Sequence, residues 1–393
     1  MSTTHTHGLV LSGGACYGAY EIGVMRALAG GTSHVTHPVV PHVIAGTSAG
    51  ALNAALLCAH FEGGLSGAVD ELERVWHTNI AETPGTCKST VLRYRGSLAE
   101  FASPACFAKD PVTPMRQLAS DASFILRDGM HRAARLLRGE TQVGQRLLDM
   151  VSLRTIICCE PYHHLVKSVV PLAKIRGAKV QLRIAATNWH TGDVRVFENS
   201  DMTDEQGHDV ILASSAIPGV FPSVRIGGVP YADGGLVMNT PLGPAIDAGA
   251  QVIHVVSVNP QIRLMKSSDL HSTIGEIYRA LAVSLESAIN RDVEIAARIN
   301  KGIRILENAE KGIYDPSTPL ANAVLTLGGQ TSKTLKNLRY QQLTIHRYEL
   351  ADPGESFLSW LDFSPSRIQS LIQSGYNDTL KHDCKASGCV LPA

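Results

Sequence analysis

Short apolar runs alternate with helical patterns along most of this chain. The runs predict β-strands at residues 8–12, 41–45, 180–187, 193–198, 209–213 and 251–258. Strands separated by helices predict parallel pairing, and the helices then cover both faces of the sheet. We therefore expect an α/β fold with helical layers over one central, mainly parallel sheet.

The chain beyond residue 260 is predicted to be mainly helical. Residues 269–299 place apolar side chains three or four positions apart, and the tail 348–380 resembles a closing strand followed by a helix. The apolar stripe could pair with a second chain, although packing on the sheet is the commoner arrangement. We expect a main domain at 8–260 with residues 261–393 packed on it, and the sequence leaves the oligomeric state unknown.

Composition changes this picture little, but it excludes one class of partner. The 393 residues carry 35 Lys and Arg against 35 Asp and Glu, so no net charge suggests nucleic acid as a partner. Only 18% of residues are charged and 44% are hydrophobic, which suits a buried parallel sheet and leaves room for an apolar groove. Residues 1–7 show no signal peptide, and no apolar run approaches the roughly 20 residues of a transmembrane helix. We expect a cytoplasmic protein.

Candidate chemistry begins at residues 46–50, which read G-T-S-A-G between an apolar run and a helical pattern of small residues. In a G-x-S-x-G nucleophile elbow, the serine occupies a cramped strand-to-helix turn, and glycines at positions such as Gly46 and Gly50 let the two backbones pass. Ser48 would stand at a helix N-terminus, where free N–H groups favour developing negative charge. A tight turn with an incidental serine is the alternative, and the strand-to-helix context favours catalysis.

A second glycine loop lies upstream, where the apolar run 9–11 leads into S-G-G-A-C-Y-G and a helical pattern. Successive N–H groups of Gly13, Gly14 and Ala15 could point at one anion, either a phosphate or the oxyanion of a tetrahedral intermediate. The chain has neither G-x-x-x-x-G-K-[ST] nor a clean G-x-G-x-x-G here, which disfavours a nucleotide site. An oxyanion hole beside Ser48 is the favoured interpretation.

A third motif, D-G-G at residues 233–235, follows a proline-rich approach at 214–222 and would by itself indicate a turn. In this order, the glycine loop, the G-T-S-A-G elbow and the late D-G-G resemble the patatin-like phospholipase family of serine acyl hydrolases. The resemblance covers roughly residues 8–62 and 180–260. It implies a patatin-like three-layer fold and a serine hydrolase that needs no cofactor.

The resemblance also implies roles for single residues. Ser48 matches the family's nucleophile and Asp233 the aspartate of its D-G-G, which makes a catalytic dyad without histidine. A carboxylate within hydrogen-bond reach of Ser48 can take its proton as general base, and burial would raise the basicity of that carboxylate. A Ser-His-Asp triad stays open, with His254 as the candidate histidine. A core position for His254 is favoured, because Asp233 already has a role.

The oxyanion loop departs from the family pattern at two positions. Gly13 and Gly14 match its first two glycines, but Ala15 stands where a third glycine is usual and Tyr17 where a basic residue is common. An alanine keeps the backbone donors in place if its φ is negative. The missing positive charge could weaken oxyanion stabilisation or change head-group preference.

A block from about residue 78 to 178 interrupts the strand and helix pattern between Ser48 and Asp233. It contains a helical section at 113–151 in which arginines separate the apolar positions. Such a basic amphipathic segment fits either an anionic membrane surface or an ordinary cap helix whose apolar stripe packs on the core, and the cap helix is favoured. In both cases we expect a lid or a wall of an acyl channel.

The eight cysteines predict no metal site. None has paired C-x-x-C spacing with nearby histidines, so zinc is not expected, and no calcium loop of the usual spacing occurs. Most of the cysteines resemble the small buried hydrophobes of a reducing compartment. We expect the protein to bind neither a metal nor another cofactor.

These observations predict a lipid acyl hydrolase of the phospholipase A or lysophospholipase type. It would cleave carboxylic esters of phospholipids or other acyl lipids through an acyl-serine intermediate, with peripheral membrane contact as an additional hypothesis. Hydrolysis of small esters or thioesters, and lipid binding without hydrolysis on the same fold, are the alternatives. Head group, acyl position, chain length and any activating ligand depend on pocket shape or partners, which the sequence does not fix.

Overall fold

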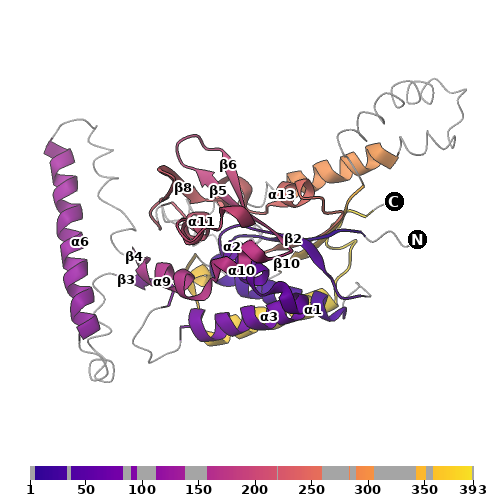
Figure 1. Ribbon diagram of the computed structural model, residues 1–393, viewed down its shortest axis with the longest axis horizontal. Helices are drawn as coiled ribbons and strands as arrows, with labels where there is room; N and C mark the ends of the chain where they lie inside the picture. Colours follow the sequence, from indigo (N-terminus) through magenta and orange to yellow (C-terminus); the bar gives the residue numbers. More distant parts are fainter. Residues whose placement is uncertain are drawn as a thin grey trace, which may run out of the picture.

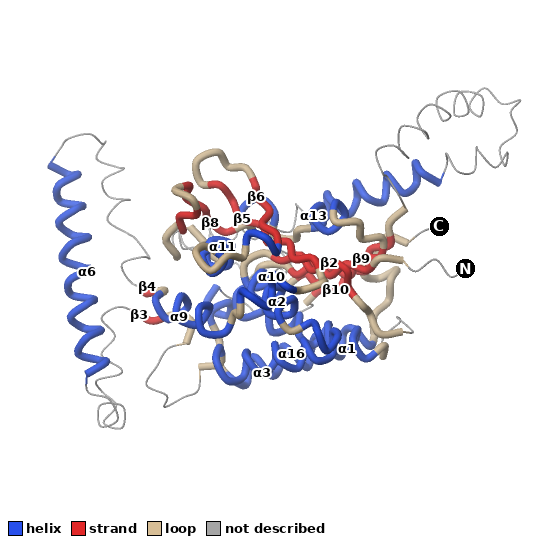
Figure 2. The backbone as a smooth tube through the Cα atoms, in the orientation of Figure 1, coloured by secondary structure: helices blue, strands red, loops and turns tan. Residues whose placement is uncertain are grey.

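Helices cover both faces of one mixed sheet in the computed structural model (Figure 1, Figure 2). The structure describes residues 5–32, 37–82, 90–94, 112–137, 157–218, 220–258, 283, 289–304, 342–350 and 357–391. The predicted three-layer α/β fold is confirmed. Among the helices described, none combines the length and the apolar character needed to span a bilayer.

The main sheet follows the order β10-β9-β1-β2-β5-β8-β7, with β6 also paired to β5. Its strands are β1 (His7–Leu11), β2 (Pro41–Gly46), β5 (Gln181–Asn188), β6 (Val194–Glu198), β7 (Val224–Ile226), β8 (Val229–Asp233), β9 (Val252–Ser257) and β10 (Thr344–Glu349). Pairing is parallel from β10 through to β5, whereas β6 and β8 run antiparallel to β5, and β7 antiparallel to β8. The carboxyl ends of the parallel strands therefore gather at one edge.

Alternate side chains of the central strands build two separate cores. The first lies on the face covered by α1 (Gly18–Gly30), α2 (Ala49–Ala59), α3 (Gly64–Val75) and α16 (Pro365–Leu380), and it takes Leu9 and Leu11 from β1. The second takes Val10 from the same strand and packs it against α13 (Leu242–Asp247) and the helix at 289–304. This alternation follows the period of two of a β-strand and produces the third layer.

Five of the six predicted strands are confirmed as β1, β2, β5, β6 and β9, and the sixth is wrong. Residues 209–213 lie in helix α11 (Gly207–Ser214), which packs against β5, β7 and β8. A short apolar run has the same pattern in a strand and in a helix that is buried on most sides, and Val210, Ile211 and Ala213 are all fully buried.

The inserted block contains a long helix, α6 (Val112–Leu137), where the first half of the helical section is predicted, and this helix stands apart from the three layers in Figure 1. The hairpin of β3 (Arg93–Tyr94) and β4 (Ile157–Cys158) joins it to the rest of the protein. Arg93 forms two hydrogen bonds of 2.6 and 2.8 Å with the buried Asp121 of α6. The second half of the predicted helical section, 138–151, lies outside the described residues.

The C-terminal part contributes to both the sheet and its helical cover. β10 pairs with β9 along its length, and α16 packs on α1, so the predicted closing strand and helix are present, with the strand beginning four residues early at Thr344. Of the helix predicted at 269–299, the structure describes helical backbone at residue 283 and from 289 to 304. The domain boundary near residue 260 stays a prediction.

Candidate active site

Ser48 occupies a sharp turn between β2 and α2. It has φ 55° and ψ −121°, a conformation that is rare for a residue with a side chain. A Cβ atom on Gly46 would collide with the carbonyl oxygen of Gly50, and one on Gly50 with the carbonyl oxygen of Leu11. Both glycines of the G-x-S-x-G motif are therefore required by close backbone contact, as the motif predicts.

Neighbouring segments hold this strained turn in place. The Thr47 N–H donates to the Leu11 carbonyl at 3.2 Å, and the Thr47 hydroxyl donates to the Met238 carbonyl at 2.9 Å. The Ser48 N–H donates to the Ser214 hydroxyl oxygen at 3.0 Å. Because the surrounding backbone fixes residue 48 from both sides, the serine side chain stays at the surface of a cleft, with 6% of the residue exposed.

Asp233 ends β8 and lines the same cleft as Ser48. Its Oδ1 accepts a 2.7 Å hydrogen bond from the Gly235 N–H, while its buried Oδ2 has no hydrogen-bond partner among the described residues. Burial raises the pKa of Asp233 to about 7, against smaller opposing effects of the Gly235 N–H and the Ser48 hydroxyl. The serine hydroxyl is thus close enough to act on the carboxyl group electrostatically, although without a tight hydrogen bond.

His254 lies elsewhere. It is fully buried in the middle of β9. Its Nε2 lies 3.3 Å from His7 Nδ1, and its Nδ1 lies 3.1 Å from the Tyr348 hydroxyl oxygen. Its ring stacks on that of His346 in β10. It is not among the described residues that line the cleft of Ser48. This arrangement matches the core position that the sequence favoured.

The glycine loop lies against Ser48, since a Cβ atom on Gly13 would be 2.8 Å from that of Ser48. The Gly13 N–H donates to the Asn239 carbonyl at 3.3 Å. Within the described part of the chain, the N–H groups of Gly14 and Ala15 make no hydrogen bond. Two of the three predicted donors are therefore available to an anion in the cleft.

Ala15 does not meet the expectation of a negative φ, because its φ is 50°. An L-residue in this left-handed region costs about 1–2 kcal/mol, since its Cβ crowds the following carbonyl oxygen. The family's usual glycine avoids this cost. The loop thus keeps the glycine-like backbone even though the side chain opposes it.

We expect Ala15→Gly to raise the free energy of unfolding by about 0.5–1 kcal/mol, because glycine accepts a positive φ but loses more entropy on folding. Urea denaturation followed by circular dichroism measures this. The matched control is Ala19→Gly, four residues on in helix α1, which should lose about 1 kcal/mol or more. Destabilisation by Ala15→Gly of the size seen in the control would contradict the strain argument.

A cation lies beside Tyr17, the neutral residue that stands where a basic one is common. Tyr17 is buried and packs edge-on against Trp360, at 6.4 Å between ring centroids. The guanidinium carbon of Arg367, from the first turn of α16, lies 5.6 Å from the centre of the Tyr17 ring. A positive charge thus stands beside the glycine loop, supplied by a distant part of the sequence.

An apolar pocket adjoins the cleft, with about 690 Å³ of empty space, part of which is open to solvent, and Ser48 and Ala15 line both. Its other walls come from α2, from the segments after α3 and after α11, from the two ends of the inserted block, and from the residues just before α16. They include Leu52, Trp76, Ile80, Val91, Leu92, Tyr162, Leu165, Val220, Phe221, Trp360 and Phe363. The pocket can accept an extended hydrocarbon group with its end at the serine.

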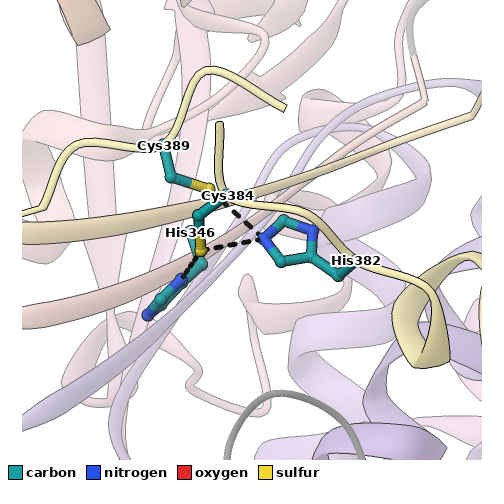
Figure 3. A group of neighbouring side chains, drawn as sticks. All are labelled: His346, His382, Cys384 and Cys389. Carbon is teal, nitrogen blue, oxygen red and sulfur yellow. Dashed lines mark hydrogen bonds between the residues drawn. The ribbon is translucent and has the colours of Figure 1, made fainter. Parts of the chain in front are cut away.

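One cluster of side chains has ligand atoms close enough to hold a metal ion, although the cysteine spacing in the sequence did not indicate one. Among the described residues, His346, His382, Cys384 and Cys389 bring their ligand atoms within 4.8 Å of one another (Figure 3). They line neither the cleft nor the apolar pocket. The search for C-x-x-C pairs missed them, although the signal H-x-C-x-x-x-x-C is present at residues 382–389.

The three-layer fold, the serine turn at the sheet edge and the adjoining apolar pocket are features of the α/β lipid acyl hydrolases. A family model described as patatin-like phospholipase matches residues 9–246, more than half of the chain, and the protein therefore belongs to this family.

Two further comparisons add little. VipD from Legionella pneumophila is a solved structure with 14% sequence identity and a TM-score of 0.36. The match covers 96% of this chain and 66% of VipD, so the chain spans slightly less than two thirds of that structure's length. A comparison with curated proteins gives no match. The family assignment rests on the match over residues 9–246.

Proposed function

We propose that this protein is a lipid acyl hydrolase that uses Ser48 as nucleophile and Asp233 as general base. The observation that carries the proposal is the shared cleft, in which a strained, nearly buried serine faces a buried carboxyl group whose Oδ2 makes no other hydrogen bond in the described structure. A carboxyl with a pKa of about 7 is matched to proton transfer near neutral pH.

The reaction would proceed in two stages. Asp233 takes the Ser48 proton as the serine oxygen attacks the ester carbonyl, and the N–H groups of Gly14 and Ala15 stabilise the oxyanion. Collapse of the intermediate breaks the ester bond, and the proton on Asp233 passes to the leaving alcohol. Water, deprotonated in turn by Asp233, then releases the acyl group from Ser48 as a free carboxylic acid.

The substrate class follows from the pocket. Its lining is apolar apart from the hydroxyls of Ser48, Ser215 and Tyr162, so a fatty acyl chain gains hydrophobic energy there that a small acetyl group does not. The two ends of the inserted block supply Ile80, Leu165 and other wall residues, which supports the proposed role of the block as a channel wall.

The test is acyl release from a panel of phospholipids, lysophospholipids, acyl thioesters and nitrophenyl esters of increasing chain length, with Ser48→Ala as the blank. Preference for long acyl chains that depends on Ser48 supports the proposal. Preference for acetyl or butyryl esters would instead support the small-ester alternative. If no ester is cleaved and a fluorophosphonate probe leaves Ser48 unlabelled, lipid binding without hydrolysis becomes the better description.

Peripheral membrane contact is the second part of the proposal, and the surface of α6 supports it. Large apolar side chains of this helix are exposed rather than packed on the core: Val112, Met115, Leu118, Ile125, Leu126 and Met130. The ion pair between Arg93 and Asp121 attaches the helix to strand β3. Exposed apolar groups on a helix that also carries arginines are typical of contact with an anionic lipid surface.

We expect the double change Ile125→Glu and Leu126→Glu to weaken binding to anionic phospholipid vesicles by about tenfold or more, since each buried aliphatic side chain contributes about 1.5–3 kcal/mol. Vesicle sedimentation measures this. Hydrolysis of a dispersed short-chain ester should be unchanged. Val40→Glu, at an equally exposed apolar position outside α6, is the control and should bind as the wild type does. Equal loss in the control would contradict a role for α6.

A further inference from the structure

Four potential metal ligands meet where the end of the chain passes over the edge strand of the sheet. His346 lies on β10, and His382, Cys384 and Cys389 lie in the segment after α16 (Figure 3). All four are partly buried, and each offers one ligand atom to the cluster. The fold thus brings His346 to three residues that lie 36 or more positions further along the sequence, and this placement is independent of the proposed hydrolase.

The distances between these atoms match those around a tetrahedral zinc ion. Cys384 Sγ lies 3.5 Å from His346 Nδ1 and 3.5 Å from His382 Nε2, and Cys389 Sγ lies 3.3 Å from His382 Nε2. With the usual zinc bonds to sulfur and nitrogen, a tetrahedron holds such atoms about 3.5 Å apart. These three distances are close to those that a bound ion would impose, and all four ligand atoms lie within 4.8 Å of one another.

We propose that His346, His382, Cys384 and Cys389 form a structural zinc site. Two thiolates and two imidazoles are the ligand set that zinc prefers, whereas calcium and magnesium require oxygen ligands. Because the protein supplies all four ligands, no position stays open for water or substrate. The site therefore has the composition of a structural centre rather than a catalytic one.

Surrounding groups orient the ligands as they do in known zinc sites. The Arg347 N–H donates to Cys389 Sγ at 3.3 Å, a contact that stabilises a thiolate. The Ser387 hydroxyl lies 3.4 Å from His382 Nδ1, the ring nitrogen that does not face the cluster. The ring of His346 stacks on that of His254, with centroids 5.3 Å apart. These contacts restrict both imidazoles and one sulfur before any ion binds.

The site would fasten the C-terminal segment to β10. This strand is the last in the order of the described sheet, so its outer edge needs a cover. Ile345 and Val390 already exchange two backbone hydrogen bonds there, of 2.7 and 2.9 Å. His346 and Cys389, which follow this bridge as the next pair of residues on the two antiparallel segments, would lock it as ligands of one ion, so zinc binding would add directly to the stability of the fold.

The experiment uses the full chain without a histidine tag, purified under reducing conditions and freed of loose metal by gel filtration. Elemental analysis should find roughly one zinc ion per chain. Cys384→Ser and Cys389→Ser should each lower zinc affinity roughly tenfold or more. Two controls should keep the metal: Cys159→Ser removes a partly buried thiol outside the cluster, and His7→Gln removes a histidine of the neighbouring ring stack.

A second measurement on the wild type is independent of whether the variants fold. After chelation and reduction, adding cobalt(II) should produce the intense sulfur-to-metal charge-transfer bands of a tetrahedral dithiolate site. Adding zinc should then remove these bands, because zinc displaces the cobalt ion. The thermal midpoint should fall on chelation and return with zinc. None of these results requires ester hydrolysis, so they separate this proposal from the enzymatic one.

Three results would overturn the site. The first is a reduced wild type that contains no zinc and gives no charge-transfer band with cobalt. The second is zinc that survives in both cysteine variants, which would place the metal elsewhere. The third is a disulfide between Cys384 and Cys389 that forms again in air even when zinc is present in excess. Mass spectrometry would detect it as the loss of two hydrogen atoms.

Discussion

Replacing Asp233 by asparagine is expected to lower kcat/KM for ester hydrolysis at least about a thousandfold and, at pH 8, to stabilise the protein. Activity falls because an amide cannot accept the serine proton. The fold survives because an amide oxygen can keep the hydrogen bond that Oδ1 accepts from the Gly235 N–H. The change therefore separates the chemical role of the carboxyl group from its structural role.

The stability gain depends on pH in a definite direction. Burial raises the folded-state pKa of Asp233 to about 7, while an unfolded aspartate titrates near 3.9. Between these values the folded protein binds the proton more tightly, so wild-type stability decreases as the pH rises from about 4 to 7. The loss amounts to about 4 kcal/mol above pH 7. The Asp233→Asn variant has no carboxyl group to lose a proton, so its free energy of unfolding should not decrease in this way. The difference in stability between the variant and the wild type should therefore grow from about pH 4 to 7.

Thermal unfolding at pH 5 and pH 8 measures the effect, with Asp193→Asn as the control at an exposed aspartate. The control should show neither the activity loss nor the pH-dependent gain. In the wild type, kcat/KM should rise with pH and level off above about 7, as Asp233 loses its proton. Full activity in Asp233→Asn, together with loss of activity in His254→Ala, would favour a histidine-based hydrolase instead.

The sequence predicts the parts of this molecule that depend on local backbone geometry. The elbow is an example, because Gly46 and Gly50 are required by contacts within a few residues and with the neighbouring strand β1. Strands β1, β2, β5, β6 and β9 are likewise visible as apolar runs of the right length. When a segment is almost completely buried, its local pattern does not distinguish a helix from a strand. For this reason α11 was predicted as a strand.

Features that combine distant segments could not be predicted in this way. Arg367 reaches the glycine loop only because α16 packs beside α1, and His346 meets Cys384 only because the chain end returns over β10. The positive φ of Ala15 is a different case. The family pattern indicates a glycine at this position, and the alanine shows that the surrounding loop, rather than the residue's own preference, decides the backbone conformation.

The backbone of Ser48, the proposed nucleophile, is also held by its surroundings at a positive φ that a residue with a side chain disfavours. Both Ser48→Ala and Ser48→Gly should abolish hydrolysis, at least about a thousandfold in kcat, because neither side chain can form an acyl ester. They should differ in stability. Alanine keeps the strain of a Cβ atom at φ 55°, whereas glycine relieves it, so Ser48→Gly should be more stable than Ser48→Ala by about 1 kcal/mol.

Urea denaturation of both variants and the wild type measures this difference. Ser168→Gly is the control, because Ser168 lies in helix α9 (Glu160–Val169) and shows no positive φ, so glycine there should only destabilise. If Ser48→Gly were less stable than Ser48→Ala, the turn would not be strained in solution. If Ser48→Gly is the more stable variant, the fold maintains strain at the nucleophile that glycine removes. Part of the folding free energy then holds the serine hydroxyl at the cleft, where the proposed reaction needs it.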